Sequence, residues 1–179
     1  ANRHQRTLTR TAHAFWGLDA PVPVFAAQIH QESHWRIDAQ SPAGAEGLAQ
    51  FMPATSEWFA SINPRDLTIA QPYNPAWAMR AQVMYNRWLY NRITAADGCS
   101  KLAFTLSAYN GGLGWVQRDQ ALASASGADG LVYTSVKPFN AGRSQASITE
   151  NRHYVDSILK RWQPIYVKTG WGPGACYAF

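Results

Sequence analysis

Apolar residues recur at helical spacing along most of this chain of 179 residues. Leu8, Ala12 and Phe15, for example, would lie on one side of a helix over residues 3–16 that ends at Gly17. No segment shows the strict apolar–polar alternation of a half-buried strand. With 46% hydrophobic and only 15% charged residues, the chain has enough apolar material for a folded core. The pattern therefore predicts an all-α protein.

Turn signals divide the chain into a series of expected helices. After the first helix, Asp19 is the expected N-cap and Pro21 the first turn of a second helix, which carries Glu32 near its end. Further helices are expected within residues 47–60 and over residues 74–93, 100–109, 113–125 and 148–163. Loops are expected over residues 39–47 and 126–146, and the tail from residue 169 has no helical period. Because no linker or internal repeat is present, we expect a single domain over residues 1–179.

The chain is basic, with a net charge of +5 and a sequence pI of about 9.4. A basic balance favours anionic partners such as nucleic acid, anionic lipid or an acidic cell-wall polymer. Lys and Arg are scattered rather than clustered, so we expect no nucleic-acid partner. No apolar run reaches the length of a membrane span, and the opening residues ANRHQRTLTR lack the apolar core of a signal peptide.

The chain contains two cysteines, Cys99 and Cys176. They are too few for a four-thiolate zinc site. They would either form one disulfide that ties the tail to the middle of the chain, which implies an oxidising compartment, or remain two buried thiols. The sequence leaves both alternatives open.

The stretch IHQESHW places Glu32 between two histidines, His30 and His34. The histidines are four residues apart and would share a helix face, as pairs of zinc ligands do. Glu32 is rotated about 200° from His30 on that helix, and no third ligand is near in sequence, which disfavours a metal site. A catalytic carboxylate would instead need apolar walls that raise its pKa, and the apolar residues downstream are candidates for such walls.

Four blocks of sequence follow one another in an order that is specific when they are taken together. They are Glu32-Ser33 with Ser41, Gly44-Ala45-Glu46-Gly47-Leu48-Ala49-Gln50 and Pro53-Ala54-Thr55; Asn74-Pro75 with Met79, Arg80, Ala81 and Tyr85; Ala108-Tyr109-Asn110 with Gly112, Gly114 and Val116; and Glu150-Asn151-Arg152-His153-Tyr154-Val155. Together they cover residues 24–160 approximately, and they resemble the soluble lytic transglycosylase family. These lysozyme-like enzymes are related to goose-type lysozyme and cleave peptidoglycan.

The chain departs from the family pattern at several positions. Ala49 replaces the usual Met, Ile37 stands where the family often has Pro, and Asn151 replaces Thr. The N-terminal segment, the loop near residues 126–146 and the tail 165–179 have no counterpart that can be assigned. These departures bear on the substrate subtype more than on the chemistry.

The resemblance implies a lysozyme-like fold with a substrate cleft, and the activity of a peptidoglycan lytic transglycosylase. In that chemistry Glu32 is a single general acid and base, because the C6 hydroxyl of N-acetylmuramic acid is the nucleophile and closes a 1,6-anhydro ring. The resemblance implies no cofactor and no metal, and it implies peptidoglycan strands as the partner. It also implies action outside the cytoplasm, in the periplasm or after delivery by a phage. We expect a monomer.

Other matched residues are candidate ligands of the glycan, and each has a structural alternative. The candidates are Ser33, Ser41, Gln50, Tyr109, Asn110, Glu150 and Tyr154. Ser41 would otherwise cap a loop, and Gln50 would be a buried structural amide. The Asn-Gly-Gly run after Tyr109 is also a helix stop, while Glu150 and Tyr154 would otherwise form a pair within one helix.

Several alternative functions remain open at this stage. A muramidase of goose type would cleave the same bond with water, and an inactive module would only bind the wall. A metal-dependent hydrolase would use His30 and His34. The sequence does not distinguish a phage lysis or host-penetration enzyme from a bacterial periplasmic or secretion-associated one.

Overall fold

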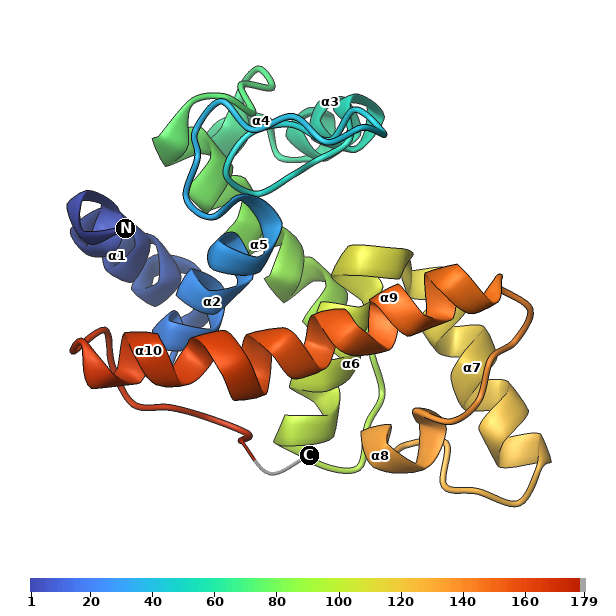
Figure 1. Ribbon diagram of the computed structural model, residues 1–179. Helices are drawn as coiled ribbons and strands as arrows, with labels where there is room; N and C mark the ends of the chain where they lie inside the picture. Colours follow the sequence, from blue (N-terminus) through green and yellow to red (C-terminus); the bar gives the residue numbers. More distant parts are fainter. Residues whose placement is uncertain (178–179) are drawn as a thin grey trace. The chain divides into compact units, whose positions relative to one another are not determined.

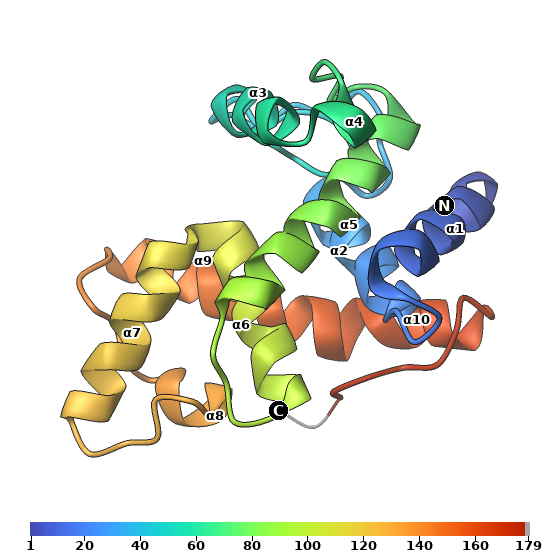
Figure 2. The ribbon, with the colours of Figure 1, turned by 180° about the vertical axis from the view of Figure 1, so that it is seen from behind.

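The computed structural model describes residues 1–177, which form helices joined by loops (Figures 1 and 2). In chain order the helices are η1 (Asn2–His4), α1 (Gln5–Trp16), α2 (Val22–Ser33), α3 (Pro53–Ile62), α4 (Pro64–Leu67), α5 (Pro75–Arg92), α6 (Gly98–Gly111), α7 (Leu113–Ala125), α8 (Tyr133–Val136), α9 (Gln145–Asp156), η2 (Ser157–Trp162) and α10 (Gln163–Lys168). Within the described residues there is no strand, only isolated bridges that join Gln40 to Glu46 and Glu46 to Phe51. The all-α prediction is confirmed. No helix in residues 1–177 combines the length and apolar character needed to cross a membrane.

Most predicted helices are present, and the structure differs from the sequence pattern at several points. Asp19 is not the N-cap of α2, because a turn intervenes and the helix begins only after Pro21. The loop expected over residues 126–146 contains the short helix α8, which places Tyr133 and Val136 in the core. The sequence pattern also did not indicate α4, which is a single helical turn.

The C-terminal helix is longer than the expected range of residues 148–163. Ser144 is the N-cap of α9, since its hydroxyl accepts a hydrogen bond from the Ser147 N–H at 3.1 Å. The helix continues through the π-helix η2 into α10, which ends at Lys168. Pro164 lies in the first turn of α10 and lacks an N–H donor, so the regular α-helical ladder cannot run unchanged through this point.

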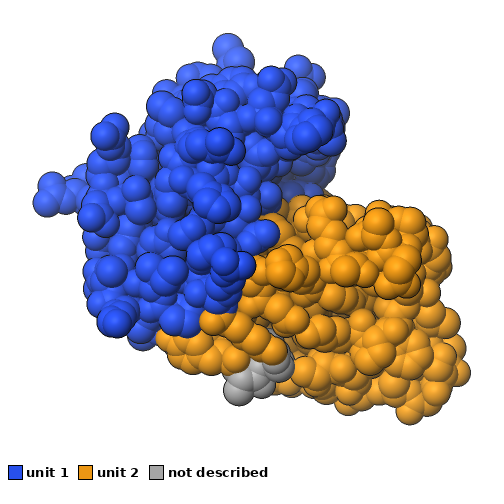
Figure 3. Space-filling view, viewed as in Figure 1, with its two compact units in different colours: residues 1–85, 161–174 blue, residues 86–160, 175–179 orange. Residues whose placement is uncertain are grey.

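The chain divides into two compact units (Figure 3). Unit 1 contains residues 1–85 and 161–174, and unit 2 contains residues 86–160 and the tail from residue 175. Helices α5 and η2 carry the chain from one unit into the other. The assignment of residues 1–179 to one catalytic domain stays a prediction, and its last two residues lie outside the described residues.

In unit 1 the core forms around α2, whose first two turns are wholly buried. Gln82 of α5 is also buried and donates through Nε2 to the Phe25 carbonyl at 3.0 Å and to Gln28 Oε1 at 2.7 Å. Trp16 at the end of α1 donates through Nε1 to the Val83 carbonyl at 2.9 Å. Because buried polar groups need partners, these bonds fix how the three helices meet. The buried first turns of α2 therefore hold the C-terminal end of this helix in position.

In unit 2 the central helix is α6, which contacts α7, α8 and α9 (Figure 2). Every residue from Leu102 to Ala108 is buried. The Asp97 carboxylate caps the start of α6 by accepting from the Ser100 N–H at 2.7 Å, and Gly112, with φ of 106°, ends the helix. Because α6 is buried and both of its ends are defined, the position of its C-terminal residues is fixed.

Cys99 and Cys176 form a disulfide, which decides between the two alternatives left open by the sequence. Both residues belong to unit 2, and the bond joins the start of α6 to the tail across 77 residues of sequence. In the chain-entropy description, closing a loop of this length stabilises a fold by about 4 kcal/mol. Such a bond is typical of proteins that work outside reducing compartments.

Candidate active site

Glu32 lies in the last turn of α2 and is half-buried. The helix ends at Ser33, and the next two residues, His34 and Trp35, have left-handed φ angles of 53° and 62°. A left-handed conformation costs a residue with a side chain roughly 1–2 kcal/mol. Two such residues in succession turn the chain sharply out of the helix directly after Glu32.

The loop after α2, residues 36–52, is held by short-range hydrogen bonds. Ser41 and Ala45 exchange two of them at 2.9 Å each: the Ser41 N–H donates to the Ala45 carbonyl, and the Ala45 N–H donates to Ser41 Oγ. Gln50 donates through Nε2 to the Gly47 carbonyl at 2.9 Å and to the Ala39 carbonyl at 3.2 Å. The Ser41 hydroxyl caps the loop, and Gln50 holds two of its backbone segments together. Contact of either residue with substrate stays a prediction.

Gly47 is required in this loop for two reasons. Its φ of 75° is left-handed, and a β-carbon at this position would overlap the Pro72 carbonyl oxygen. The Gly47 N–H also donates to the Ala39 carbonyl at 2.8 Å. The close approach of two backbone segments here explains the second glycine of the Gly-Ala-Glu-Gly sequence.

His30 and His34 belong to an aromatic cluster. The His30 ring stacks on Trp162 with 4.0 Å between ring centroids, and His30 Nδ1 lies 2.8 Å from the Tyr166 hydroxyl. Burial lowers the pKa of His30, and the neighbouring His34 and Arg161 lower it further. Among residues 1–177, no group of three His, Cys, Asp or Glu side chains is arranged to hold a metal ion.

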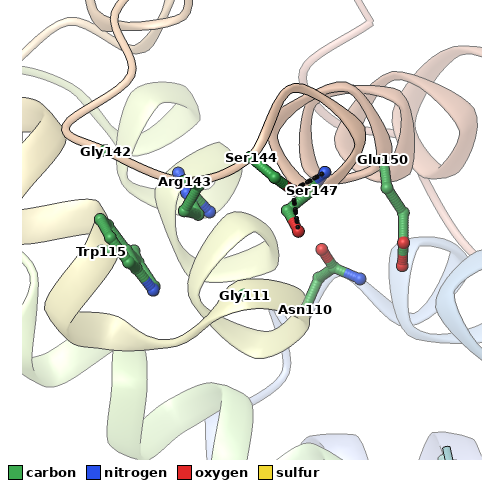
Figure 4. A pocket seen from close by; sticks show the side chains of 8 residues that line it. All are labelled: Asn110, Gly111, Trp115, Gly142, Arg143, Ser144, Ser147 and Glu150. Atoms are coloured by element: carbon green, nitrogen blue, oxygen red, sulfur yellow. Dashed lines mark hydrogen bonds between the residues drawn. The ribbon is translucent and has the colours of Figure 1, made fainter.

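A second candidate region is a pocket of about 420 Å³ in unit 2 (Figure 4). It is lined by the end of α6, by α7, by the loop before α9 and by the first turns of α9. The lining residues are Asn110, Gly111, Trp115, Gly142, Arg143, Ser144, Ser147 and Glu150. The pocket combines one flat aromatic wall, amide and hydroxyl groups, and one carboxylate. This mixture suits a polar ligand with apolar faces, such as a sugar.

Asn110 is positioned in this pocket by Asn151 of α9. Asn151 Nδ2 donates to Asn110 Oδ1 at 3.0 Å and to the Ser107 carbonyl at 2.9 Å. The Ser107 hydroxyl donates to Asn151 Oδ1 at 2.7 Å. Because its oxygen is engaged, Asn110 presents its amide N–H groups as donors. Asn151, which departs from the family's Thr, therefore links α9 to α6 and orients a predicted site residue.

The loop before α9 is anchored by buried charges. Asp119 of α7 is 1% exposed and accepts through Oδ2 from Arg143 and, at 3.0 Å, from Arg152. Its Oδ1 accepts from the Ala141 N–H at 2.8 Å. Burial lowers the pKa of Arg143, while the Asp119 carboxylate opposes this shift. One carboxylate thus holds two guanidinium groups and the backbone of the loop.

The predicted site residues divide between the two units. Glu32, Ser33, Ser41 and Gln50 belong to unit 1, and Tyr109, Asn110, Glu150 and Tyr154 belong to unit 2. Ser33 is buried, and its hydroxyl donates to the Ile29 carbonyl at 3.2 Å. Tyr154 is also buried, whereas Glu150 is exposed and lines the pocket with Asn110.

Sequence reasoning did not identify part of the pocket lining. It missed Trp115, Arg143, Ser144 and Ser147. The residues from 142 to 147 lie in or beside the loop that has no counterpart in the family pattern, so no motif marks them. A tryptophan just after a helix stop was a weak signal for Trp115, since aromatic rings often line sugar sites.

The transglycosylase SLT domain family matches residues 14–132 of this chain. The match covers more than half of the chain, and the chain belongs to this family. The resemblance found in the sequence is therefore confirmed.

Known proteins agree with this assignment. A membrane-bound lytic murein transglycosylase F from Vibrio parahaemolyticus is 28% identical over 154 residues, which are 79% of this chain and 28% of that protein. The protein of the same name from Pasteurella multocida is 29% identical over 132 residues, covering 73% and 24% of the two chains. The chain spans about a quarter of the length of the curated relatives it matches.

Solved structures of similar fold include two lytic transglycosylases. The 70 kDa soluble lytic transglycosylase of Escherichia coli matches 97% of this chain and 25% of its own, with a TM-score of 0.70 and 21% identity. An inactive glutamate-to-glutamine mutant of lytic transglycosylase Slt from Pseudomonas aeruginosa matches 93% of this chain and 24% of its own, with a TM-score of 0.68 and 25% identity. The predicted lysozyme-like fold class is confirmed.

Proposed function

We propose that this chain is the catalytic module of a peptidoglycan lytic transglycosylase, with Glu32 as its single acid and base. The observation that carries the proposal is the family match over residues 14–132, which contains Glu32 and the whole loop that follows it. The names of the relatives, lytic murein transglycosylases, support the same activity and the same polymer as substrate.

Glu32 would act twice in one turnover. Its carboxylic acid first donates a proton to the glycosidic oxygen between N-acetylmuramic acid and N-acetylglucosamine, and the C1–oxygen bond breaks. The muramic C6 hydroxyl then bonds to C1, and the Glu32 carboxylate takes the hydroxyl proton, which restores the acid. No water is consumed, and one product ends in a 1,6-anhydro ring. A group that serves as acid and then base works best with a pKa near the working pH.

A known relative supports this use of one glutamate. The Pseudomonas aeruginosa enzyme of similar fold was solved as an inactive mutant in which a glutamate is replaced by glutamine. In the present chain Glu32 is half-buried near the sharp end of α2. Among the acidic side chains that follow in sequence, Asp38 and Glu57 are exposed, whereas Glu46 is half-buried and forms a hydrogen bond with the Tyr73 side chain.

The pocket of unit 2 is proposed to bind sugar or peptide groups of the wall polymer. Trp115 offers a ring face, Asn110 offers amide donors, and Glu150 offers an acceptor. Replacing Glu150 by Gln keeps the size of the side chain and removes its charge. We expect Glu150→Gln to raise KM several-fold and to change kcat little, because it removes a binding interaction that is equally strong in the ground state and in the transition state.

Mass analysis of a peptidoglycan digest tests the chemistry. We expect fragments with 1,6-anhydro ends, which lack one water relative to reducing ends. Glu32→Gln should abolish cleavage and keep wall binding, while Glu57→Gln, an exposed glutamate on α3, should behave as wild type. If the digest contained reducing ends only, the chain would instead act as a goose-type muramidase, which uses water. Full cleavage by Glu32→Gln would show that the acid is elsewhere.

The cellular compartment in which the chain acts follows from the proposed substrate. Peptidoglycan lies outside the cytoplasm, so the proposal places the action of this chain there, which agrees with its disulfide. The expected absence of a nucleic-acid partner and the expected monomeric state stay predictions. The positive net charge of +5 should speed encounter with an anionic wall and should do so less at high salt.

A further inference from the structure

The residues on both sides of Glu32 are tied to one segment near the C-terminus. Before Glu32, Gln31 Oε1 accepts a hydrogen bond from Trp162 Nε1 at 2.7 Å. After it, Trp35 Nε1 donates to the Tyr166 hydroxyl at 2.7 Å. Helices α2 and α10 contact each other in unit 1, and Figure 1 shows them side by side.

His30 completes this set of contacts from the same turn of α2. Its ring stacks on Trp162 with an interplanar angle of 15° and lies within hydrogen-bond distance of the Tyr166 hydroxyl. We call the set of His30, Gln31, Trp35, Trp162 and Tyr166 the α2 clamp. All of its members belong to unit 1.

Hydrogen-bond chemistry favours the neutral form of His30 in the α2 clamp. The Trp35 indole can only donate, so the Tyr166 oxygen accepts from it and directs its own proton to another group. His30 Nδ1 lies 2.8 Å away and accepts this proton when it carries a lone pair, and we assign this tautomer to His30. With this assignment the intact clamp contains a neutral His30. Protonation at Nδ1 would place two donors against the Tyr166 oxygen and leave the tyrosine proton without its acceptor.

The backbone after Glu32 needs such support. His34 and Trp35 both have left-handed φ angles, which persist only when surrounding contacts hold them. The Trp35 ring provides such contacts, because it stacks on His4 with 5.8 Å between centroids and packs against Trp171 at 5.5 Å. Weakening the Trp35–Tyr166 bond should therefore loosen the turn that sets the position of Glu32.

The family match does not include two of the five members of the α2 clamp. It ends at residue 132, and Trp162 and Tyr166 lie beyond that point. The support for the helix end that bears Glu32 is thus supplied by a part of the chain outside the matched domain.

We propose that Trp162 and Tyr166 are positioning residues for Glu32, and that the α2 clamp opens when His30 becomes protonated. This inference rests on the proposed role of Glu32. A single acid-base glutamate that starts the reaction protonated predicts a loss of kcat only toward alkaline pH. The clamp adds a loss of kcat on the acidic side, because protonated His30 no longer accepts from Tyr166.

The charged groups that face His30 all lower its pKa. His34 directly follows the end of α2, Arg161 belongs to η2, and the amino group of Ala1 precedes η1. All three charges disfavour the cationic form of His30, after burial as the main cause. The pKa of His30 is thus lowered from its ordinary value of 6.5. A lowered pKa in the folded state means that the clamp's stabilisation is complete above pH 6.5 and is lost as the pH falls through the folded-state pKa.

Two variants test the α2 clamp by activity. Tyr166→Phe keeps the ring and removes both hydrogen bonds, so we expect kcat to fall about tenfold with KM changed less than about twofold. His30→Asn keeps an acceptor oxygen near the position of Nδ1 and cannot titrate, so its kcat, relative to its own value at neutral pH, should no longer fall on the acidic side. Tyr177→Phe, an exposed tyrosine outside the clamp, is the matched control.

An NMR titration of the His30 ring tests the α2 clamp without activity. In Tyr166→Phe the neutral ring loses its donor, so the pKa of His30 should rise toward its ordinary value. An unchanged His30 titration in this variant, or an unchanged acidic loss of kcat in His30→Asn, would overturn the proposal. If the wild type cleaves no peptidoglycan, the proposed function fails on its own, and the NMR result still decides whether Tyr166 holds His30 neutral.

Discussion

The loop that follows α2 and the loop that precedes α9 are held in place by different forces. In the first, residues 36–52, backbone groups and neutral side chains such as Gln50 bond over short separations in sequence. In the second, residues 137–144, the buried carboxylate of Asp119 holds Arg143 from 24 residues away. Both loops carry residues proposed to meet substrate.

This difference shows two ways to hold a functional loop on a helical scaffold. Neutral short-range bonds cost little desolvation, and each contributes on the order of 1 kcal/mol. A buried ion cluster is worth little overall relative to an apolar core, yet removing one partner leaves charges buried without compensation. The first loop should therefore lose stability gradually when residues are changed, and the second should lose it abruptly.

The largest effect is expected at the ion cluster. Asp119→Asn keeps the shape of the side chain and leaves the guanidinium groups of Arg143 and Arg152, 6% and 12% exposed, without a carboxylate. We expect a loss of about 3–5 kcal/mol in the free energy of unfolding, measured by chemical denaturation. Asp38→Asn, at an exposed position in the other loop, is the control and should change stability by less than about 0.5 kcal/mol. A loss below about 1 kcal/mol for Asp119→Asn would remove the proposed contrast between the loops.

A smaller but still large effect is expected at the close backbone approach in the first loop. Gly47→Ala should cost about 3 kcal/mol, because its β-carbon meets the Pro72 carbonyl and its φ is left-handed. Gly44→Ala shares the left-handed φ but has open space around it, so it should cost about 1–2 kcal/mol. Thermal unfolding of the two variants measures the difference. Equal losses of stability in the two variants would mean that the left-handed φ alone, without the close approach to the Pro72 carbonyl, explains why residue 47 is a glycine.

Gln50→Ala should have an intermediate effect on stability and a clear effect on activity. The variant loses two hydrogen bonds to backbone carbonyls, so we expect a loss of about 2 kcal/mol. Since the loop follows directly from the helix end that bears Glu32, peptidoglycan cleavage should also fall, measured as kcat/KM at 25 °C. Normal cleavage by a destabilised Gln50→Ala would separate the structural role of this amide from any role in the site.

The smallest effect is expected at an ion pair that is partly exposed. Lys137 and Asp156 lie 2.7 Å apart with a third of each side chain exposed. Lys137→Met should cost about 0–1 kcal/mol, and the loss should shrink in high salt because solvent screens this pair. Measuring Asp119→Asn in the same salt series tests whether the buried ion cluster contributes more to stability than the partly exposed pair. A loss as large as that of Asp119→Asn would show that exposure does not set the strength of these pairs.

Local patterns were sufficient for much of the fold. The helical period and the Gly and Pro signals predicted most helices, because these signals act within a few residues of sequence. They failed where packing decided the outcome. Tyr133 and Val136 form a single helical turn only because they pack into a core, and no periodicity over so short a segment can predict that.

The sequence by itself determined the all-α class, the family and the choice of Glu32 as the candidate acid, because these depend on residue types at fixed spacings. The tertiary structure alone decided that Cys99 and Cys176 are bonded, that Arg143 lines a pocket, and that His30 lies within hydrogen-bond distance of Tyr166. Each of these depends on residues 24 or more positions apart, whose proximity arises from the packing of helices and leaves no mark in a local pattern.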